Sequence, residues 1–159
     1  MMNKNKIDCN VIRVFGPSVM KVKIPEDILN KLNTYTDEVI SNKKKSSELN
    51  MGEDLLGDVT QEIKLEKNIL KESGWLEFLA YCTHRWIELE MNKKISEFKI
   101  IESWIVRQFE NEYNPTHFHS GHISGAGFLK VPETLGEHVQ KKNTKKYIGG
   151  NLQLIHGAN

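Results

Sequence analysis

Three of the six histidines of this chain lie within six positions, in the stretch "NPTHFHSGHISGAGFLKVPE" (residues 114–133). If "THFH" is extended, the alternation of side chains puts His117 and His119 on one face and Phe118 on the other. Neutral imidazoles spaced about 7 Å apart at Cα can aim ring nitrogens at one metal ion. His122 follows the turn-forming "SG" as a third ligand, an outer partner or an exposed side chain. We therefore expect His117 and His119 to bind a metal or, as histidines in turns do, to make ordinary hydrogen bonds.

Small residues follow the histidines. Gly125 and Gly127 have no side chains, so they leave open volume in which a ligand could lie beside His117 and His119. Such glycines also mark bulges and close approaches of two backbones. The sequence is consistent with either a pocket or a bulge here.

The histidines come after a predicted strand. In "FKIIESWIVRQFE" (98–110) both faces carry bulk, as in a strand covered on each side. One face holds Ile101, Ser103, Ile105, Arg107 and Phe109, and the other holds Glu102, Trp104, Val106 and Gln108. Two later stretches, "ISGAGFLKV" and "GGNLQLIHG", are further strand candidates, separated by the lysine-rich loop "QKKNTKK". Residues 98–159 are therefore expected to be rich in strands and to hold the histidines.

Residues 1–97 are predicted to combine strands with supporting helices. "VIRVF" and "VMKVKI" flank "GPS" as a strand pair, in which apolar residues alternate with lysines. Pro25 fits a helix start, and the helix behind it carries a stripe of Ile28, Leu29, Leu32, Tyr35 and Val39. A second helix from about Ser73 carries Trp75, Leu79, Cys82, Trp86 and Leu89. Both helices are expected to lie on a sheet, and "SNKKKSSELNMGEDLLGD" is expected to be an exposed loop.

Length and composition limit the class of protein. The 159 residues suit a single domain, 1–159. Because 22 basic residues face 21 acidic ones, the net charge of +1 gives no general attraction for nucleic acid or an anionic membrane. No apolar run could span a bilayer, the N-terminus lacks the pattern of a signal peptide, and two distant cysteines suit a reducing compartment. We expect a cytoplasmic protein that binds neither nucleic acid nor membrane.

The run "ESWIVRQFENEYNPTHFHSGHISGAGFLKVPE" resembles the central part of the Fe(II)/2-oxoglutarate-dependent oxygenases found in marine phages and bacteria, which are distant relatives of prolyl hydroxylases. The matching features are "W…Q…ENEYNP", then H-x-H-x-G, then "SG" leading into an apolar strand that ends "LKVP". The N-terminal strand pair, the helix after Pro25 and "GDVTQEI" also look like this family. The likeness covers most of the chain.

The resemblance implies a double-stranded β-helix, a jelly-roll barrel of α+β or mostly β class with N-terminal helices packed on the sheet. It also implies a dioxygenase in which a 2-His-1-carboxylate triad holds Fe(II), with 2-oxoglutarate as co-substrate, and which hydroxylates a protein side chain or a small molecule. By position, His117 matches the first histidine and His119 the carboxylate. An imidazole there leaves more positive charge on the metal, so three nitrogens bind it, His119 and His122 share the role, or a nearby group supplies the anion.

The resemblance also points to co-substrate contacts at Gln108, Asn114 and Phe128. Phe128 stands where many relatives carry tyrosine, so the hydroxyl that could bond the distal carboxylate of 2-oxoglutarate is missing. Gln108 and Asn114 lie near the same mouth in the resemblance. They either compensate for that loss or make surface hydrogen bonds.

No histidine-to-arginine segment follows "GGNLQLIHGAN", where the family carries a distal iron-binding histidine and a 2-oxoglutarate-binding arginine. We therefore expect an incomplete barrel and an inactive fragment of the oxygenase, in which His156 is not the distal ligand. The alternative is a non-redox, cupin-like module that binds a metal or a sugar and in which H-x-H is structural. The sequence identifies neither the substrate nor the oligomeric state.

Overall fold

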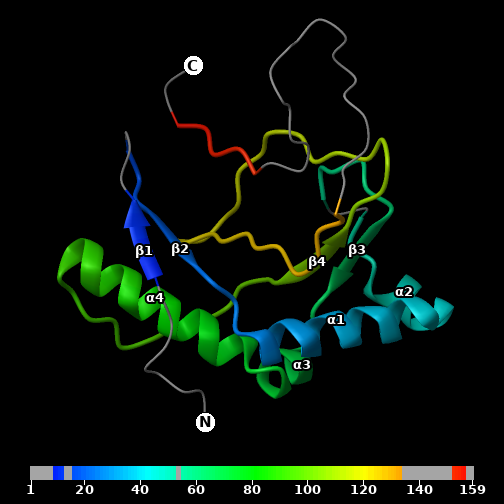
Figure 1. The fold of residues 1–159 in the computed structure, drawn as a ribbon, viewed down its shortest axis with the longest axis horizontal. Coiled ribbons are helices and arrows are strands. Elements are labelled where there is room, and N and C mark those ends of the chain that lie inside the picture. The colour runs from blue at the N-terminus through cyan, green and yellow to red at the C-terminus, as the bar shows by residue number, and fades with distance from the viewer. Residues whose placement is uncertain (1–8, 13–15, 53–54, 134–151, 157–159) are drawn as a thin grey trace, which may run out of the picture.

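The structure is a computed structural model that describes residues 9–12, 16–52, 55–133 and 152–156. Figure 1 shows two small antiparallel sheets and four helices among these residues. In chain order the elements are β1 (Cys9–Ile12), β2 (Val19–Val22), α1 (Glu26–Ser41), α2 (Lys43–Leu49), β3 (Gln61–Lys64), α3 (Lys67–Glu72), α4 (Trp75–Met91) and β4 (Trp104–Arg107). The fold is mixed helix and sheet, and the described residues form no closed barrel.

The first sheet confirms the predicted strand pair. β1 and β2 are antiparallel, with Cys9 opposite Val22 and Ile12 opposite Val19. Met20, Val22 and Ile24 pack against the core, while the intervening lysines point to solvent. The first strand begins earlier than "VIRVF" predicts, and residues 13–15 lie outside the described part of the chain.

Helix α1 follows Pro25 as predicted and supplies much of the core. Ile28, Leu32, Tyr35 and Val39 are buried, as the stripe predicts, whereas Leu29 is only half-buried. Thr36 is buried as well, because its hydroxyl donates a 2.7 Å hydrogen bond to the Leu32 carbonyl and so needs no water.

Helix α4 packs on the same core, but its buried face only partly coincides with the predicted stripe. Phe78 and Cys82 are its buried residues. Trp75 stacks on Phe78 with ring centroids 5.5 Å apart, and Leu79 also packs against the core. Leu89, predicted on the buried face, is 50% exposed. The helix therefore packs on the core through its first half.

The prediction of an exposed loop over "SNKKKSSELNMGEDLLGD" is wrong in part, because residues 43–49 form α2. The Asn42 side chain accepts a 3.1 Å hydrogen bond from the Lys45 backbone amide, which caps the helix start. Lys44 and Glu48 lie one turn apart, 3.8 Å from each other. Leu49 packs against the core and fixes the end of the helix.

The β-rich second half is the larger difference. The predicted strand over 98–110 is present only as β4, and "ISGAGFLKV" forms no strand. Residues 152–156 of "GGNLQLIHG" are also irregular, and the loop "QKKNTKK" lies outside the described residues. Gly125 and Gly127 weaken a strand, and no described strand lies alongside 123–131 to supply a ladder. None of the described helices is both long and apolar enough to pass through a membrane.

Candidate metal site

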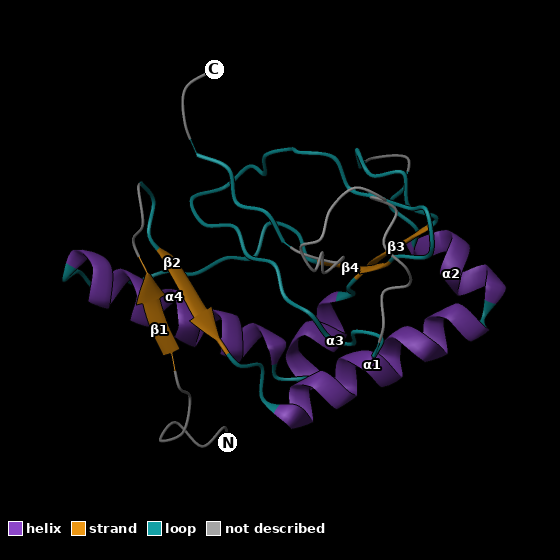
Figure 2. Cartoon of the chain, turned by 45° about the horizontal axis from the view of Figure 1, so that its top comes forward, coloured by secondary structure: helices purple, strands orange, loops and turns teal. Residues whose placement is uncertain are grey.

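The second sheet divides the molecule into a core side and a histidine side. β3 and β4 are antiparallel, with Glu62 opposite Val106, Ile63 opposite Ile105 and Lys64 opposite Trp104. Ile63 is buried in the core and Ile105 packs against it. Because side chains alternate along a strand, the opposite face carries Glu62, Lys64, Trp104 and Val106. Figures 1 and 2 show α1 on one side of this sheet and the chain after β4 on the other.

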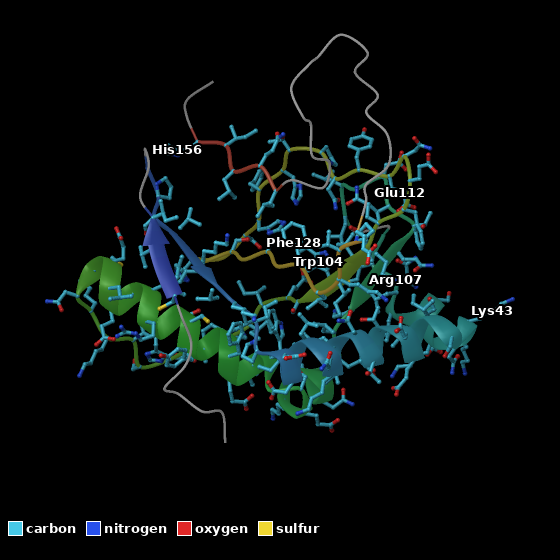
Figure 3. The ribbon with its side chains drawn as sticks, in the orientation of Figure 1. Lys43, Trp104, Arg107, Glu112, Phe128 and His156 are labelled. Atoms are coloured by element: carbon cyan, nitrogen blue, oxygen red, sulfur yellow. The ribbon has the colours of Figure 1, made fainter. Side chains whose placement is uncertain are left out.

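A polar clamp fixes the point where the histidine segment leaves the sheet. Glu112 accepts hydrogen bonds from the Thr60 amide and hydroxyl, at 3.0 and 2.6 Å, and from the Phe109 amide at 2.8 Å. Donation by the Thr60 hydroxyl is the main cause that holds the pKa of Glu112 below its usual range. Asp58 and Tyr113 then form an antiparallel bridge. Figure 3 shows Glu112 beyond the Arg107 end of β4.

The structure brings the two predicted ligands together. The Nε2 atoms of His117 and His119 lie 2.8 Å apart, with ring centroids 4.7 Å apart. Phe118, between them in sequence, is 94% exposed and points away. The edge of the Trp104 indole contacts the His119 ring, with centroids 5.4 Å apart. Both imidazoles therefore reach a common point, but the segment is irregular backbone and both rings are exposed, not enclosed in a cavity as predicted. Their role as metal ligands stays a prediction.

The outer nitrogens of the two rings are already engaged. His117 Nδ1 lies 2.7 Å from the Pro115 carbonyl, which can only accept, so Nδ1 carries a proton and donates it. A neutral His117 therefore has its lone pair on Nε2. His119 Nδ1 lies 2.8 Å from the Ser124 hydroxyl, which can donate or accept. Rotation of that hydroxyl lets His119 carry its proton on either nitrogen.

Two arrangements fit the 2.8 Å separation. In the first, His119 Nε2–H donates to His117 Nε2 in an ordinary hydrogen bond. In the second, both Nε2 lone pairs face one ion. With metal–nitrogen bonds of about 2.0–2.1 Å, nitrogens at a right angle lie about 2.9 Å apart and nitrogens at the tetrahedral angle about 3.3 Å apart. The observed separation is closer to the right-angled edge of an octahedral site.

A carboxylate is buried on the histidine side of the sheet. Glu62 is 1% exposed, and its Oε2 accepts no hydrogen bond from any residue that the structure describes. Burial raises the pKa of Glu62, the positive charge of His117 lowers it, and the nearby carboxylate of Glu112 raises it. The pKa of Glu62 therefore lies above its usual range, with burial as the main cause, and the carboxyl group is close enough to His117 for their charges to interact.

The other predicted site residues do not gather around the histidine pair in the described contacts. Gln108 donates to the Glu112 carbonyl, and the side chain of Asn114 packs against the backbone of Gly57. Phe128 is 57% exposed, and its role as a co-substrate contact, like that of Gln108 and Asn114, stays a prediction. His122 is exposed.

The two glycines differ in their surroundings. A Cβ at Gly125 would meet no atom of a residue beyond its chain neighbours within 4 Å, whereas a Cβ at Gly127 would lie 3.3 Å from Ile24 Cδ1. The His156 ring lies against Gly16, at the end of the first sheet (Figure 3). It therefore belongs to a different part of the fold from the pair.

Within the described ranges, no three histidine, cysteine, aspartate or glutamate side chains lie close enough together to hold a metal ion directly. The described part of the candidate site therefore consists of two imidazole nitrogens and a nearby glutamate whose Oε2 has no hydrogen-bond partner among the described residues. No protein-family model matches the chain, and no curated protein or solved structure matches it either. The likeness to the oxygenases accordingly stays a matter of the motifs in the sequence.

Sequence reasoning did not find Glu62 or Ser124. Glu62 alternates with Val59, Ile63 and Leu65 in a way that predicts a polar outer face, and local sequence does not show that a distant segment covers it. Ser124 is five residues from His119 in an irregular segment, where no period predicts which side chains meet. Glu62 was missed because contacts with a distant segment bury it, and Ser124 because it lies in an irregular part of the backbone.

Proposed function

We propose that this chain carries the two-histidine part of the metal centre of an Fe(II)/2-oxoglutarate-dependent dioxygenase, with His117 and His119 as ligands. The observation that carries the proposal is the pair of Nε2 atoms 2.8 Å apart, on rings whose Nδ1 atoms have other partners. Metal-binding histidines commonly donate their second ring N–H to a carbonyl or other oxygen, which fixes the tautomer and orients the ring.

The separation of the nitrogens is compatible with Fe(II) as the bound ion. A facial site places its ligands at right angles and leaves neighbouring positions open for co-substrate and O₂. Two nitrogens at 2.8 Å need only small ring movements to serve as neighbouring ligands of such a site. The bound iron would supply the coupling of 2-oxoglutarate decarboxylation to hydroxylation of a C–H bond.

The roles of the chain's own residues follow from their contacts. The Pro115 carbonyl holds the proton of His117 on Nδ1 and so presents the Nε2 lone pair. The Ser124 hydroxyl can accept a hydrogen bond from His119 Nδ1–H, which leaves the lone pair of His119 on Nε2. The T-shaped contact of Trp104 with the His119 ring limits the rotation of that ring.

The test is anaerobic titration of the chain with Fe(II), with and without 2-oxoglutarate, followed by visible absorption. A charge-transfer band that requires both components is the expected result. It should disappear in His117→Ala and persist in His84→Ala, which removes an exposed histidine of α4.

A different outcome would support the alternative function. Tight binding of Zn(II), with no band and no effect of 2-oxoglutarate, would overturn the oxygenase proposal in favour of a non-redox metal-binding module. Absence of metal binding altogether would leave His117 and His119 as a hydrogen-bonded pair and would overturn both functions.

A further inference from the structure

Glu62 occupies an unusual position for a carboxylate. It lies in β3, directly opposite Val106 and diagonal to Trp104, on the face turned from the core. Trp104 in turn contacts the His119 ring. The same face of the sheet therefore carries both the carboxylate and the side chain that contacts the histidine pair, and the glutamate is 1% exposed.

The Oε2 atom of the buried Glu62 has no hydrogen bond to compensate its burial among the described residues. Burying a charged group is costly unless it is paired or hydrogen-bonded. Its Oε2 has no hydrogen-bond donor among the residues described, and the ion pairs found there join Lys44 to Glu48, Lys45 to Glu66 and Arg85 to Glu88. A buried acceptor without a donor indicates that a positively charged or hydrogen-donating group belongs beside it.

We propose that the Glu62 carboxylate is the anionic partner of the divalent cation bound by His117 and His119, and that it acts by accepting a hydrogen bond from a cation-bound water molecule. This inference rests on the metal site of the proposed function. We place a water molecule between Glu62 and the cation because, in the described ranges, no three histidine, cysteine, aspartate or glutamate side chains are close enough for direct coordination. Glu62 is therefore a positioning and charge-balancing residue that does not bind the metal itself.

The charges of the site explain why such a partner is needed. Two neutral imidazoles leave the full double charge of the cation in place, whereas a carboxylate ligand would halve the excess. In H-x-H the second position cannot supply that anion. A glutamate on the neighbouring sheet can supply it from a segment that is distant in sequence.

The experiment is a titration with Mn(II), with free metal followed by electron paramagnetic resonance, on the wild-type chain and on Glu62→Gln. Loss of an outer partner of a metal site should weaken Mn(II) binding by about 10–100-fold. The matched control is Glu97→Gln, which makes the same charge change at an exposed position and should bind as the wild type does. Glu62→Asp keeps the charge and should bind more tightly than Glu62→Gln.

Thermal unfolding of the metal-free proteins separates a metal role from a structural one. Glu62→Gln removes a buried charge and keeps the side-chain size, so its midpoint should equal or exceed that of the wild type. If Glu62→Gln bound Mn(II) as tightly as the wild type while His117→Ala lost binding, the metal site would stand and the role of Glu62 would fall. Absence of Mn(II) binding by the wild type would overturn both. If Glu62→Gln failed to fold, equal binding by Glu62→Asp and Glu62→Ser would still contradict the inference.

Discussion

The helical part of the molecule and the histidine segment are held in place in different ways. Phe78 and Ile28 in the helical part are each 1% exposed and lie in one continuous core. In the segment 114–133, Phe118 is 94% exposed and Phe128 57% exposed. Burial of apolar surface stabilises the first region, whereas the second makes few apolar contacts with the core, such as that of Leu129, and its histidines are held by hydrogen bonds to the Pro115 carbonyl, the Ser124 hydroxyl and each other.

The difference separates stability from chemistry. The histidine pair can change its proton positions, or accept an ion, without disturbing the core, because neither ring is buried in it. The core also fixes the sheet of β3 and β4, because Ile63 is buried in it and Ile105 packs against it. The histidine segment follows this sheet in the chain. Substitutions in the helical part should therefore change the free energy of unfolding, and substitutions in the segment should change metal affinity.

The largest expected effect is on stability. Phe78→Ala should lower the free energy of unfolding by about 3–5 kcal/mol, because it leaves a cavity in the core. The matched change Phe118→Ala removes the same atoms from an exposed position and should stay within about 0.5 kcal/mol. Urea denaturation measures both. Similar losses in the two variants would show that the segment is part of the core.

Removal of a ligand comes next. His117→Ala should weaken Mn(II) binding by about 100-fold or more, which corresponds to about 2.7 kcal/mol. The unfolding midpoint of the metal-free protein should not change, because the ring is exposed. Calorimetric titration gives the affinity, and His84→Ala serves as the control. Unchanged affinity in His117→Ala would contradict the assignment of the pair.

The serine that contacts His119 should have a smaller effect. Ser124→Ala removes the partner of Nδ1, so the ring loses the group that selects its tautomer, and metal affinity should fall by about tenfold. Ser120→Ala, a change in the same segment without a described contact to either ring, should leave the affinity as it is. Two equal losses would indicate that the segment's general order, and not the Nδ1 contact, controls binding.

The smallest predicted effect is a dependence on alkaline pH in the helical part. Burial, with the nearby Glu66, raises the pKa of Tyr35 from 10.0 to about 12. Below pH 10 the phenol is neutral in both states; as the pH rises toward 12 the unfolded state loses its proton first, so stability falls. Tyr35→Phe should lower the free energy of unfolding by about 1 kcal/mol at neutral pH, because the hydrogen bond to Glu66 is lost. The stability of this variant should then decline less steeply than that of the wild type as the pH rises. Urea midpoints at about pH 8 and about pH 11 test this. Parallel declines would contradict it.

Sequence periodicity predicted the helical part well, because packing there repeats along the chain. The stripe of α1 and the alternation in β2 follow directly from side-chain periods. The buried face of α4 was less well predicted, since both Phe78 and Leu89 fit apolar positions and tertiary packing chose between them. Helix α2 was predicted as a loop from its lysine-rich composition. Its formation depends on the Asn42 cap and on the packing of Leu49, and neither changes the composition enough to be noticed.

The site was predicted in part. The rings of His117 and His119 meet, but the strand alternation from which this was predicted is absent, because the backbone there is irregular. The partners of the rings depend on an irregular backbone, and the nearest buried carboxylate comes from β3. Register between β3 and β4, which no local pattern encodes, brings Glu62 to that face.

The pairing of β3 with β4 also sets an order of assembly. β3 ends at Lys64 and β4 begins at Trp104, so the whole of α3 and α4 must be looped out before the two strands meet. Closing that loop lowers the entropy of the chain before any contact between the strands forms, whereas the helices form from local contacts. We expect the hairpin of α3 and α4 to form early and the histidine pair to be completed last. A nascent or partly unfolded chain would then have a helical core but no binding site.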